Sequence, residues 1–141
     1  MNQYVLCFVP LEPDHYRPTR TVLIEKIKPE WQRGKLNLPG GKVELNEHPT
    51  AAVERELMEE TGLYAKHIRI LGKLTGPDYL IHVARCLVPI DSKPVQMEAE
   101  LVHNMWIDEA LVHPRLIPNL RLIIPLCMAG VTGWTIQDTG Q

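Results

Sequence analysis

Residues 41–63 constrain the fold more than any other segment, because they join a glycine turn to a helix-forming run that carries a group of glutamates. Pro49 suits the first turn of a helix, where its missing N–H costs nothing, and Gly62 supplies a stop. Between them, Glu56, Glu59 and Glu60 are spaced i, i+3 and i+4. A helix places residues at that spacing on one face. The pattern therefore predicts a helix whose carboxylates lie within reach of a common point.

Such a group of acids needs a physical reason. Like charges at this spacing repel, and each pair costs an isolated helix a few tenths of a kcal/mol. A cation among the oxygens would remove that cost, and ligands that are all oxygens favour Mg²⁺, Mn²⁺ or Ca²⁺ over zinc or copper. The alternative is a solvated acidic face without a ligand, which the spacing taken alone favours.

Residues around the acidic face fit the cation interpretation. Glu47 just precedes the helix, where a carboxylate complements the positive end of the helix dipole. Arg55 is placed to reach Glu47, Glu59 or both, and so to orient ligand side chains. Gly40 and Gly41 let the backbone approach a metal or a phosphate oxygen closely, since they carry no side chain.

The rest of the chain alternates strand-like runs with one further helix. Apolar, β-branched and aromatic residues predict strands at residues 4–9, 21–27, 68–74, 79–88, 104–107 and 133–137. A polar loop with prolines, around residues 13–18, separates the first two, and a second helix is predicted at residues 116–128, bent at Pro125. With 141 residues, no repeat and no linker, the pattern predicts one domain, residues 1–141, of the mixed α/β sandwich class.

Charge and composition disfavour several classes of protein. The 15 Lys and Arg against 17 Asp and Glu give a net charge of −2, which offers no basic field to a nucleic-acid duplex. The longest apolar stretch, residues 122–131, is about half the roughly 20 residues that a membrane span needs. No Lys or Arg occurs in the first ten residues, so they do not resemble a secretory signal. Three scattered cysteines form no disulfide framework, so we expect a cytoplasmic protein.

The segment also carries a family resemblance. Residues 41–63 resemble the Nudix box of the Nudix hydrolase superfamily at every defining position, namely Gly41, Glu47 and the run Arg55-Glu56-Leu57-Met58-Glu59-Glu60-Thr61-Gly62-Leu63. The preceding run Leu38-Pro39-Gly40-Gly41-Lys42-Val43-Glu44 looks like the family's approach to that box. Two positions depart from the family pattern. Leu36 stands where many relatives have a tryptophan, and His48 stands where a Ser or Thr helix cap is usual.

The resemblance implies a fold and a chemistry. The fold is an α/β/α sandwich, in which a mixed sheet carries the box helix and a C-terminal helix. The activity is metal-dependent hydrolysis of a nucleoside diphosphate linked to a further group. By the match, Glu56, Glu59 and Glu60 are metal ligands, with the Gly40 carbonyl as an additional one, and Mg²⁺ is the cofactor, with Mn²⁺ as a substitute.

The resemblance leaves the general base open, because relatives use either a box glutamate or an acid from a later loop. Glu59 and Glu60 are the box candidates, and Arg55 and Glu47 support them. Glu100, six residues before Trp106, is the candidate from the later loop. Glu98 competes with Glu100, and both also fit ordinary solvated loop residues.

Substrate selection is specified more weakly. Asn119 resembles the position at which relatives that cleanse nucleotide pools read a purine edge, although a plain helix start explains it too. Tyr79 lies sixteen residues beyond Leu63, at a spacing associated with dinucleoside polyphosphates, and Pro77 lies near the spacing associated with ADP-ribose. Both also fit simple turn and strand-edge roles.

The leading hypothesis is hydrolysis of a nucleoside triphosphate, intact or oxidised, to a monophosphate and pyrophosphate by a monomer or homodimer. ADP-ribose or a dinucleoside polyphosphate is the alternative substrate. A nucleotide-binding or regulatory module without turnover is the rival from another class, and it is disfavoured because such members usually lose box carboxylates. An isomerase on the same fold would need further catalytic residues that the sequence does not identify.

Overall fold

Two sheets form the centre of the protein in the computed structural model, which describes residues 1–11 and 19–138. The larger sheet has the strand order β5 (Gly40–Lys42), β1 (Asn2–Phe8), β7 (Tyr79–Leu87), β6 (Lys66–Thr75) and β9 (Trp134–Gln137). β1 pairs with β7 and β6 with β9 in parallel, whereas the other pairs are antiparallel, so the sheet is mixed. The predicted polar loop around residues 13–18 lies outside the described residues.

The smaller sheet is built around β3 (Arg20–Glu25). β8 (Leu101–Trp106) pairs along one edge of β3, and β2 (Pro10–Leu11) and β4 (Leu36–Asn37) pair along the other. β2 follows β1 almost directly, and β5 follows β4 after two residues, so two stretches of chain pass from one sheet to the other. The Cys7 N–H donates to the Pro39 carbonyl at 2.9 Å where these stretches run together. This bond holds the glycine turn against β1.

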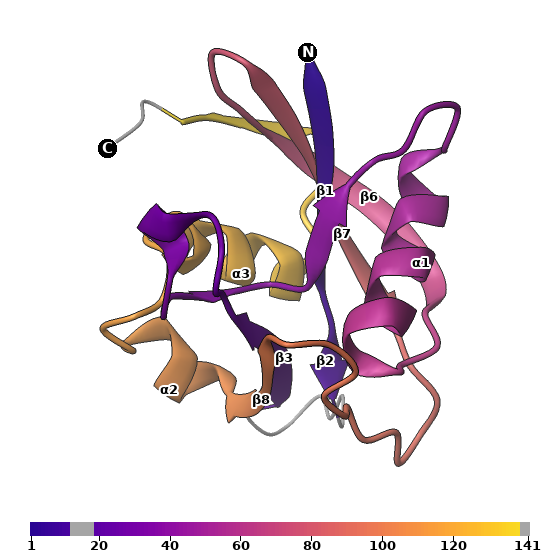
Figure 1. Ribbon diagram of the computed structural model, residues 1–141, viewed down its shortest axis with the longest axis vertical. Helices are drawn as coiled ribbons and strands as arrows, with labels where there is room; N and C mark the ends of the chain where they lie inside the picture. Colours follow the sequence, from indigo (N-terminus) through magenta and orange to yellow (C-terminus); the bar gives the residue numbers. More distant parts are fainter. Residues whose placement is uncertain (12–18, 139–141) are drawn as a thin grey trace.

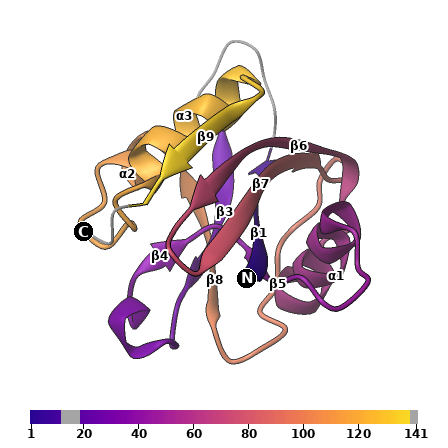
Figure 2. The same cartoon turned by 90° about the horizontal axis from the view of Figure 1, so that it is seen from above.

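Helices cover both faces of the larger sheet. α1 (Pro49–Thr61) lies on one face, and α3 (Leu120–Ala129) lies on the other, with α2 (Ile107–Leu111) and the smaller sheet on the same side as α3 (Figures 1 and 2). A 3-10 helix, η1 (Glu30–Gln32), lies between β3 and β4. The predicted α/β/α sandwich with a mixed sheet is confirmed. No helix within the described residues is long and apolar enough to cross a membrane.

The core has two halves that meet at the larger sheet. Along β1 and just beyond it, Val5, Cys7 and Val9 pack in the half that includes α1. Leu6 and Phe8 pack in the half that includes α3. Because successive side chains of a strand point to opposite faces, a strand covered on both faces has an uninterrupted apolar sequence. Burial on both sides explains the apolar run that predicted this strand.

The structure corrects the predicted second helix. It begins at Leu120 rather than at residue 116, because Leu116 forms a β-bridge to Leu36 of β4 instead of joining the helix. The Leu36 N–H donates to the Arg115 carbonyl at 2.8 Å, and the Ile117 N–H donates to the Leu36 carbonyl at 3.0 Å. The apolar residues at 116 and 117 therefore lie outside the helix, which continues through Pro125.

Two further elements differ from the prediction. β8 begins at Leu101 rather than at residue 104, because its whole length pairs with β3. α2 was not predicted, and its five residues include Asp108 and Glu109 in the first turn, where acids favour a helix start. Neither difference moves the acidic helix.

Candidate active site

The acidic helix begins and ends where the sequence predicts. His48 is the N-cap of α1, and its Nδ1 accepts a hydrogen bond from the Thr50 N–H at 3.1 Å. The imidazole thus takes the role that a Ser or Thr hydroxyl usually has at a helix cap. Gly62 ends the helix in the left-handed region, with φ of 70°.

The chain between β7 and β8 docks on the end of this helix. The Val95 N–H donates to the Thr61 carbonyl at 2.9 Å, and the Met97 N–H donates to the Glu60 carbonyl at 3.4 Å. These bonds satisfy carbonyls that a helix end leaves without partners. They also bring Glu98 and Glu100, which follow directly, beside the acidic face.

Arg55 is the centre of a network of acids. Its Nε and Nη2 donate to the two carboxylate oxygens of Glu47 at 2.9 and 3.0 Å. Its Nη1 donates to Glu56 at 2.8 Å and to Glu59 at 3.4 Å, and its Nη2 also reaches the Lys42 carbonyl at 3.0 Å. The paired bonds from Arg55 lower the pKa of Glu47 to about 2. Glu47 therefore stays ionised and fixes the guanidinium.

Glu60 has the opposite environment. The residue is only 6% exposed, and its Oε1 accepts the Gly40 N–H at 2.9 Å. Burial is the main reason that its pKa rises to about 8, and the nearby charges of Glu56 and Glu100 add to the rise. The pKa of Glu56 is raised too, again chiefly by burial. Burial removes water from the carboxylates of Glu56 and Glu60, and a bound cation would compensate for this loss of solvation.

The glycine turn forms a cradle for these acids. A Cβ atom at position 41 would lie 2.4 Å from the carboxyl carbon of Glu56, so a side chain there would force that carboxylate to move. A Cβ at position 40 would lie 1.9 Å from the Val5 carbonyl oxygen, because β5 runs close beside β1. The candidate metal-ligand atoms around the glycine turn are all oxygens, which fits Mg²⁺ or Mn²⁺.

Among the residues that the structure describes, no three acidic, histidine or cysteine side chains converge on a metal position as they stand. The hydrogen-bond partners of the three glutamates explain this arrangement. Glu56 and Glu59 turn to Arg55, while Glu60 turns to the Gly40 N–H. Side-chain rotation would have to draw these carboxylates together around an ion. The ligand roles of the three acids and of the Gly40 carbonyl therefore stay predictions.

Both loop candidates for the general base lie near the acidic cluster, which is formed by Glu56, Glu59 and Glu60. Glu100 is bound to Lys26, with 3.2 Å between Nζ and Oε2, and it accepts the Ile27 N–H at 3.1 Å. Its charge raises the pKa of Glu60, and the charge of Glu98 raises that of Glu56. The structure thus brings both acids close without choosing between them.

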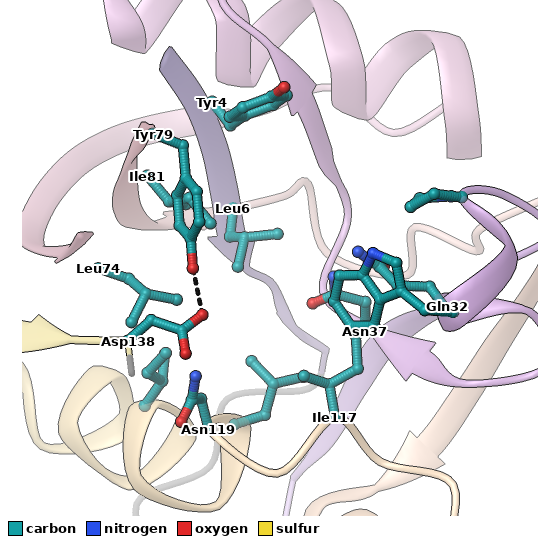
Figure 3. Close-up of a pocket in the computed structure, with 14 residues that line it drawn as sticks. Tyr4, Leu6, Gln32, Asn37, Leu74, Tyr79, Ile81, Ile117, Asn119 and Asp138 are labelled. Atoms are coloured by element: carbon teal, nitrogen blue, oxygen red, sulfur yellow. Dashed lines mark hydrogen bonds between the residues drawn. The ribbon is translucent and has the colours of Figure 1, made fainter. Parts of the chain in front are cut away.

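A pocket of about 360 Å³ lies on the other face of the larger sheet. Its apolar lining comes from the larger sheet, from the segment just before α3 and from α3 itself, through Leu6, Leu74, Ile81, Ile117, Leu120 and Ile123. Figure 3 shows the labelled polar side chains of Asn119, Tyr79 and Asp138 gathered at one side of this space. The residues Tyr4 and Leu6 of the lining pair in register with Lys42 and Gly40 of β5. The edge strand β5 therefore adjoins both the pocket and the acidic cluster.

The structure places the two predicted substrate-binding residues in this one pocket. Asn119 occupies the N-cap position of α3, but its side chain makes no capping hydrogen bond. Tyr79 is the first residue of β7. Pro77, by contrast, is exposed in the turn between β6 and β7 and is not part of the pocket lining.

Three polar pocket residues were missed by sequence reasoning. Gln32 comes from η1, Asn37 from β4, and Asp138 follows β9. Asn37 uses its Oδ1 to accept the Leu38 N–H at 2.8 Å, which leaves the amide nitrogen as its donor. Asn37 lies three residues before the glycine pair, and that nearness was the one available signal. Gln32 and Asp138 lie far from any motif.

Comparisons with known proteins identify the family of the chain. The sequence model of the NUDIX domain matches residues 5–127. The 8-oxo-dGTP diphosphatase of Escherichia coli strain K12 is 50% identical over 40 residues, which are 28% of this chain and 31% of that protein. The RNA pyrophosphohydrolase of Stenotrophomonas maltophilia strain K279a is 33% identical over 72 residues, or 47% of this chain and 35% of that protein. The chain thus spans about a third of the length of these curated relatives.

Solved structures extend the similarity to almost the whole chain. The Mutator MutT protein from Bacillus halodurans superposes with a TM-score of 0.74 at 21% identity, covering 99% of this chain and 92% of that one. With the match of the domain model over residues 5–127, the chain belongs to the Nudix superfamily.

Proposed function

We propose that this protein is a Mg²⁺-dependent hydrolase that converts a nucleoside triphosphate to a nucleoside monophosphate and pyrophosphate. The observation that carries the proposal is the position of β5. Gly40 and Gly41 lie beside Glu56 and Glu60, and the same strand pairs with pocket residues of β1. A nucleotide with its base in the pocket would then extend across the edge of the sheet, so that its phosphates reach the acids.

The acidic cluster supports cleavage of a diphosphate. The anionic oxygens of a diphosphate repel a nucleophile. Bound divalent ions would neutralise this negative charge and acidify water. In this proposal Glu56, Glu59 and Glu60 hold the ions, and the Gly40 carbonyl assists. Arg55 orients Glu56 and Glu59 and is itself fixed by Glu47.

A proton must also leave the attacking water. Glu100 is held by Lys26 and by the Ile27 N–H, so its carboxylate is fixed in position and close enough to affect Glu60. These contacts favour Glu100 as the general base. Glu98 is the competing acid, because its charge acts on Glu56. Glu59, which is about half exposed, is the box alternative.

The pocket supports the choice of a nucleotide with one base. Its volume of about 360 Å³ is at the lower end of the range for small-molecule sites, roughly 300 to 1,000 Å³. Apolar walls suit the faces of a base, and Asn119 and Asn37 supply amide groups for its edge. The relatives named 8-oxo-dGTP diphosphatase and RNA pyrophosphohydrolase add support by similarity.

The test is a panel of nucleoside triphosphates, ADP-ribose and dinucleoside polyphosphates, incubated with Mg²⁺ and analysed for products. We expect a triphosphate to give monophosphate and pyrophosphate, and chelation of Mg²⁺ to stop the reaction. Glu59→Gln should lower the rate at least about 1,000-fold, since several kcal/mol of transition-state stabilisation are lost. Glu54→Gln, on the same helix but off the acidic face, is the matched control and should keep the rate. An unchanged rate in Glu59→Gln would overturn the proposal.

A further inference from the structure

The smaller sheet has an open edge along β8. β8 pairs with β3 over its whole length, and no described strand pairs with the other edge of β8 (Figure 1). Its sequence, Leu101-Val102-His103-Asn104-Met105-Trp106, has no Lys, Arg, Asp, Glu or proline, and its pairing with β3 has no bulge. Proteins usually protect a free strand edge with charges, prolines or bulges, because unpaired backbone groups recruit another strand. The open edge of β8 has none of these three protections.

The other edge strands of the described chain are short. β5 and β9, at the two ends of the larger sheet, have three and four residues. β2 and β4, on the other side of β3, have two residues each. A short edge strand offers few backbone groups to another chain. With six residues, β8 is therefore the edge strand best suited to pairing.

The pairing with β3 determines which backbone groups of β8 face outward. The Ile107 N–H, just after the strand, donates to the Thr19 carbonyl, just before β3, at 3.0 Å. In an antiparallel pair, successive residues alternate between bonding to the partner strand and pointing away from it. The register between β8 and β3 continues without a shift from this bond to the start of β8. The residues that direct their N–H and carbonyl groups to the open edge are therefore Val102, Asn104 and Trp106.

The edge of β8 is complementary to itself. Opposite residues of antiparallel strands point to the same face of a sheet, and a twofold axis perpendicular to the sheet keeps each side chain on its own face. Even-numbered residues of β8 can therefore pair only with even-numbered residues of its copy. Centred on Asn104, the pairing places Val102 opposite Trp106 of the second copy, and His103 opposite Met105. Trp106 is 42% exposed in the single chain, so this register gives it an apolar neighbour.

We propose that β8 pairs with β8 of a second copy of this chain, in an antiparallel register centred on Asn104, so that the two smaller sheets become one continuous sheet. Val102, Asn104 and Trp106 each exchange backbone hydrogen bonds with the residue opposite. One strand buries less surface than the roughly 800 Å² per partner of a standard interface, so we expect a weak dimer, with a dissociation constant of about 10 to 100 µM. The association needs neither metal nor substrate.

Sedimentation equilibrium in the presence of chelator tests the association. Between about 1 and 500 µM, the mean mass of the natural chain should rise from that of one chain towards that of two. Asn104→Lys, at an exposed position, places two like charges opposite each other and should weaken the association at least about tenfold. Thr135→Lys, at an exposed position of the edge strand β9, is the matched control and should associate as the natural chain does.

Amide hydrogen exchange of the natural chain, followed by NMR, reports on the strand edge without any substitution. The amides of Val102, Asn104 and Trp106 should exchange more slowly as the protein concentration rises, because pairing protects them. The amides of His103 and Met105 face β3 and should be protected at every concentration. A mass of one chain throughout would overturn the inference and leave the edge to a strand of another protein. Equal association in Asn104→Lys, or edge exchange that does not depend on concentration, would overturn it too.

Discussion

The acidic cluster and the pocket are built in opposite ways. The cluster comes mainly from one continuous segment, residues 40–60, and is held by bonds between charged groups and backbone. The pocket is mostly apolar and takes its lining from both sheets, η1, α3 and the residue after β9. The cluster concentrates charged side chains, whereas the pocket is mostly apolar and includes the acid Asp138. Under the proposed function, the reaction chemistry would depend on one continuous segment, whereas substrate selection would depend on residues distributed along the chain.

The same contrast recurs within the cluster. The paired bonds from Arg55 lower the pKa of Glu47 to about 2, while burial raises that of Glu60 to about 8. Two carboxylates at opposite ends of one helix therefore have pKa values shifted in opposite directions. Environments that separate the pKa values of neighbouring acids are a common way to assign them different roles. Here Glu47 anchors the arginine, and burial disfavours the charged form of Glu60.

Among the substitutions that distinguish the acidic cluster from the pocket, Arg55→Lys should have the largest effect. Lysine cannot form the paired bonds to Glu47 while also contacting Glu56, so the ligand carboxylates lose their orientation. We expect kcat to fall about 10- to 100-fold with little change in metal-free monophosphate binding. Steady-state kinetics and calorimetry check this. An equal loss of monophosphate affinity would show that the two regions are not separable.

Asn119→Ala should affect the pocket alone. Its side chain makes no capping bond in α3, so its removal should change the free energy of unfolding by less than about 0.5 kcal/mol. Loss of a hydrogen bond to the base should raise KM about tenfold, with kcat nearly unchanged. Kinetics with the preferred triphosphate measure both constants. A fall in kcat without a rise in KM would contradict a role in base binding.

Glu47→Gln should show the smallest effect, as a change in acid stability. Because the folded pKa of Glu47 lies below its ordinary value of 4.5, its ionised form stabilises the native state. That contribution is complete above about pH 4.5 and is lost as the pH falls through about 2. Urea unfolding should therefore find the natural chain more stable than the variant at pH 6, with a difference that shrinks towards pH 2. A constant difference would exclude this linkage.

The fold was predictable where the pattern was local. The strand at β1, the start of α1 at Pro49 and its end at Gly62 follow from periodicity, proline placement and a glycine in the left-handed region. The later start of α3 was not predictable, because the bonds of residues 115–117 to Leu36 come from a strand eighty residues earlier. The division into two sheets has the same origin in long-range pairing.

The site divides in the same manner. The spacing of Glu56, Glu59 and Glu60 predicts an acidic face from the sequence alone, and Arg55 makes the predicted contacts to Glu47 and Glu59. Asp138 carries no sequence signal, because only the pairing of β9 with β6 brings it to the pocket. A residue placed by a terminal strand cannot be found from a motif eighty residues away.

Binding of Mn²⁺, followed by electron paramagnetic resonance, tests most directly whether the crowded acids hold a divalent ion. The account predicts that the natural chain and Glu54→Gln bind Mn²⁺ equally, and that Glu56→Gln and Glu60→Gln each weaken binding at least about tenfold. Mg²⁺ should compete for the same site. Equal Mn²⁺ affinity in all four proteins, or no binding by the natural chain, would contradict it.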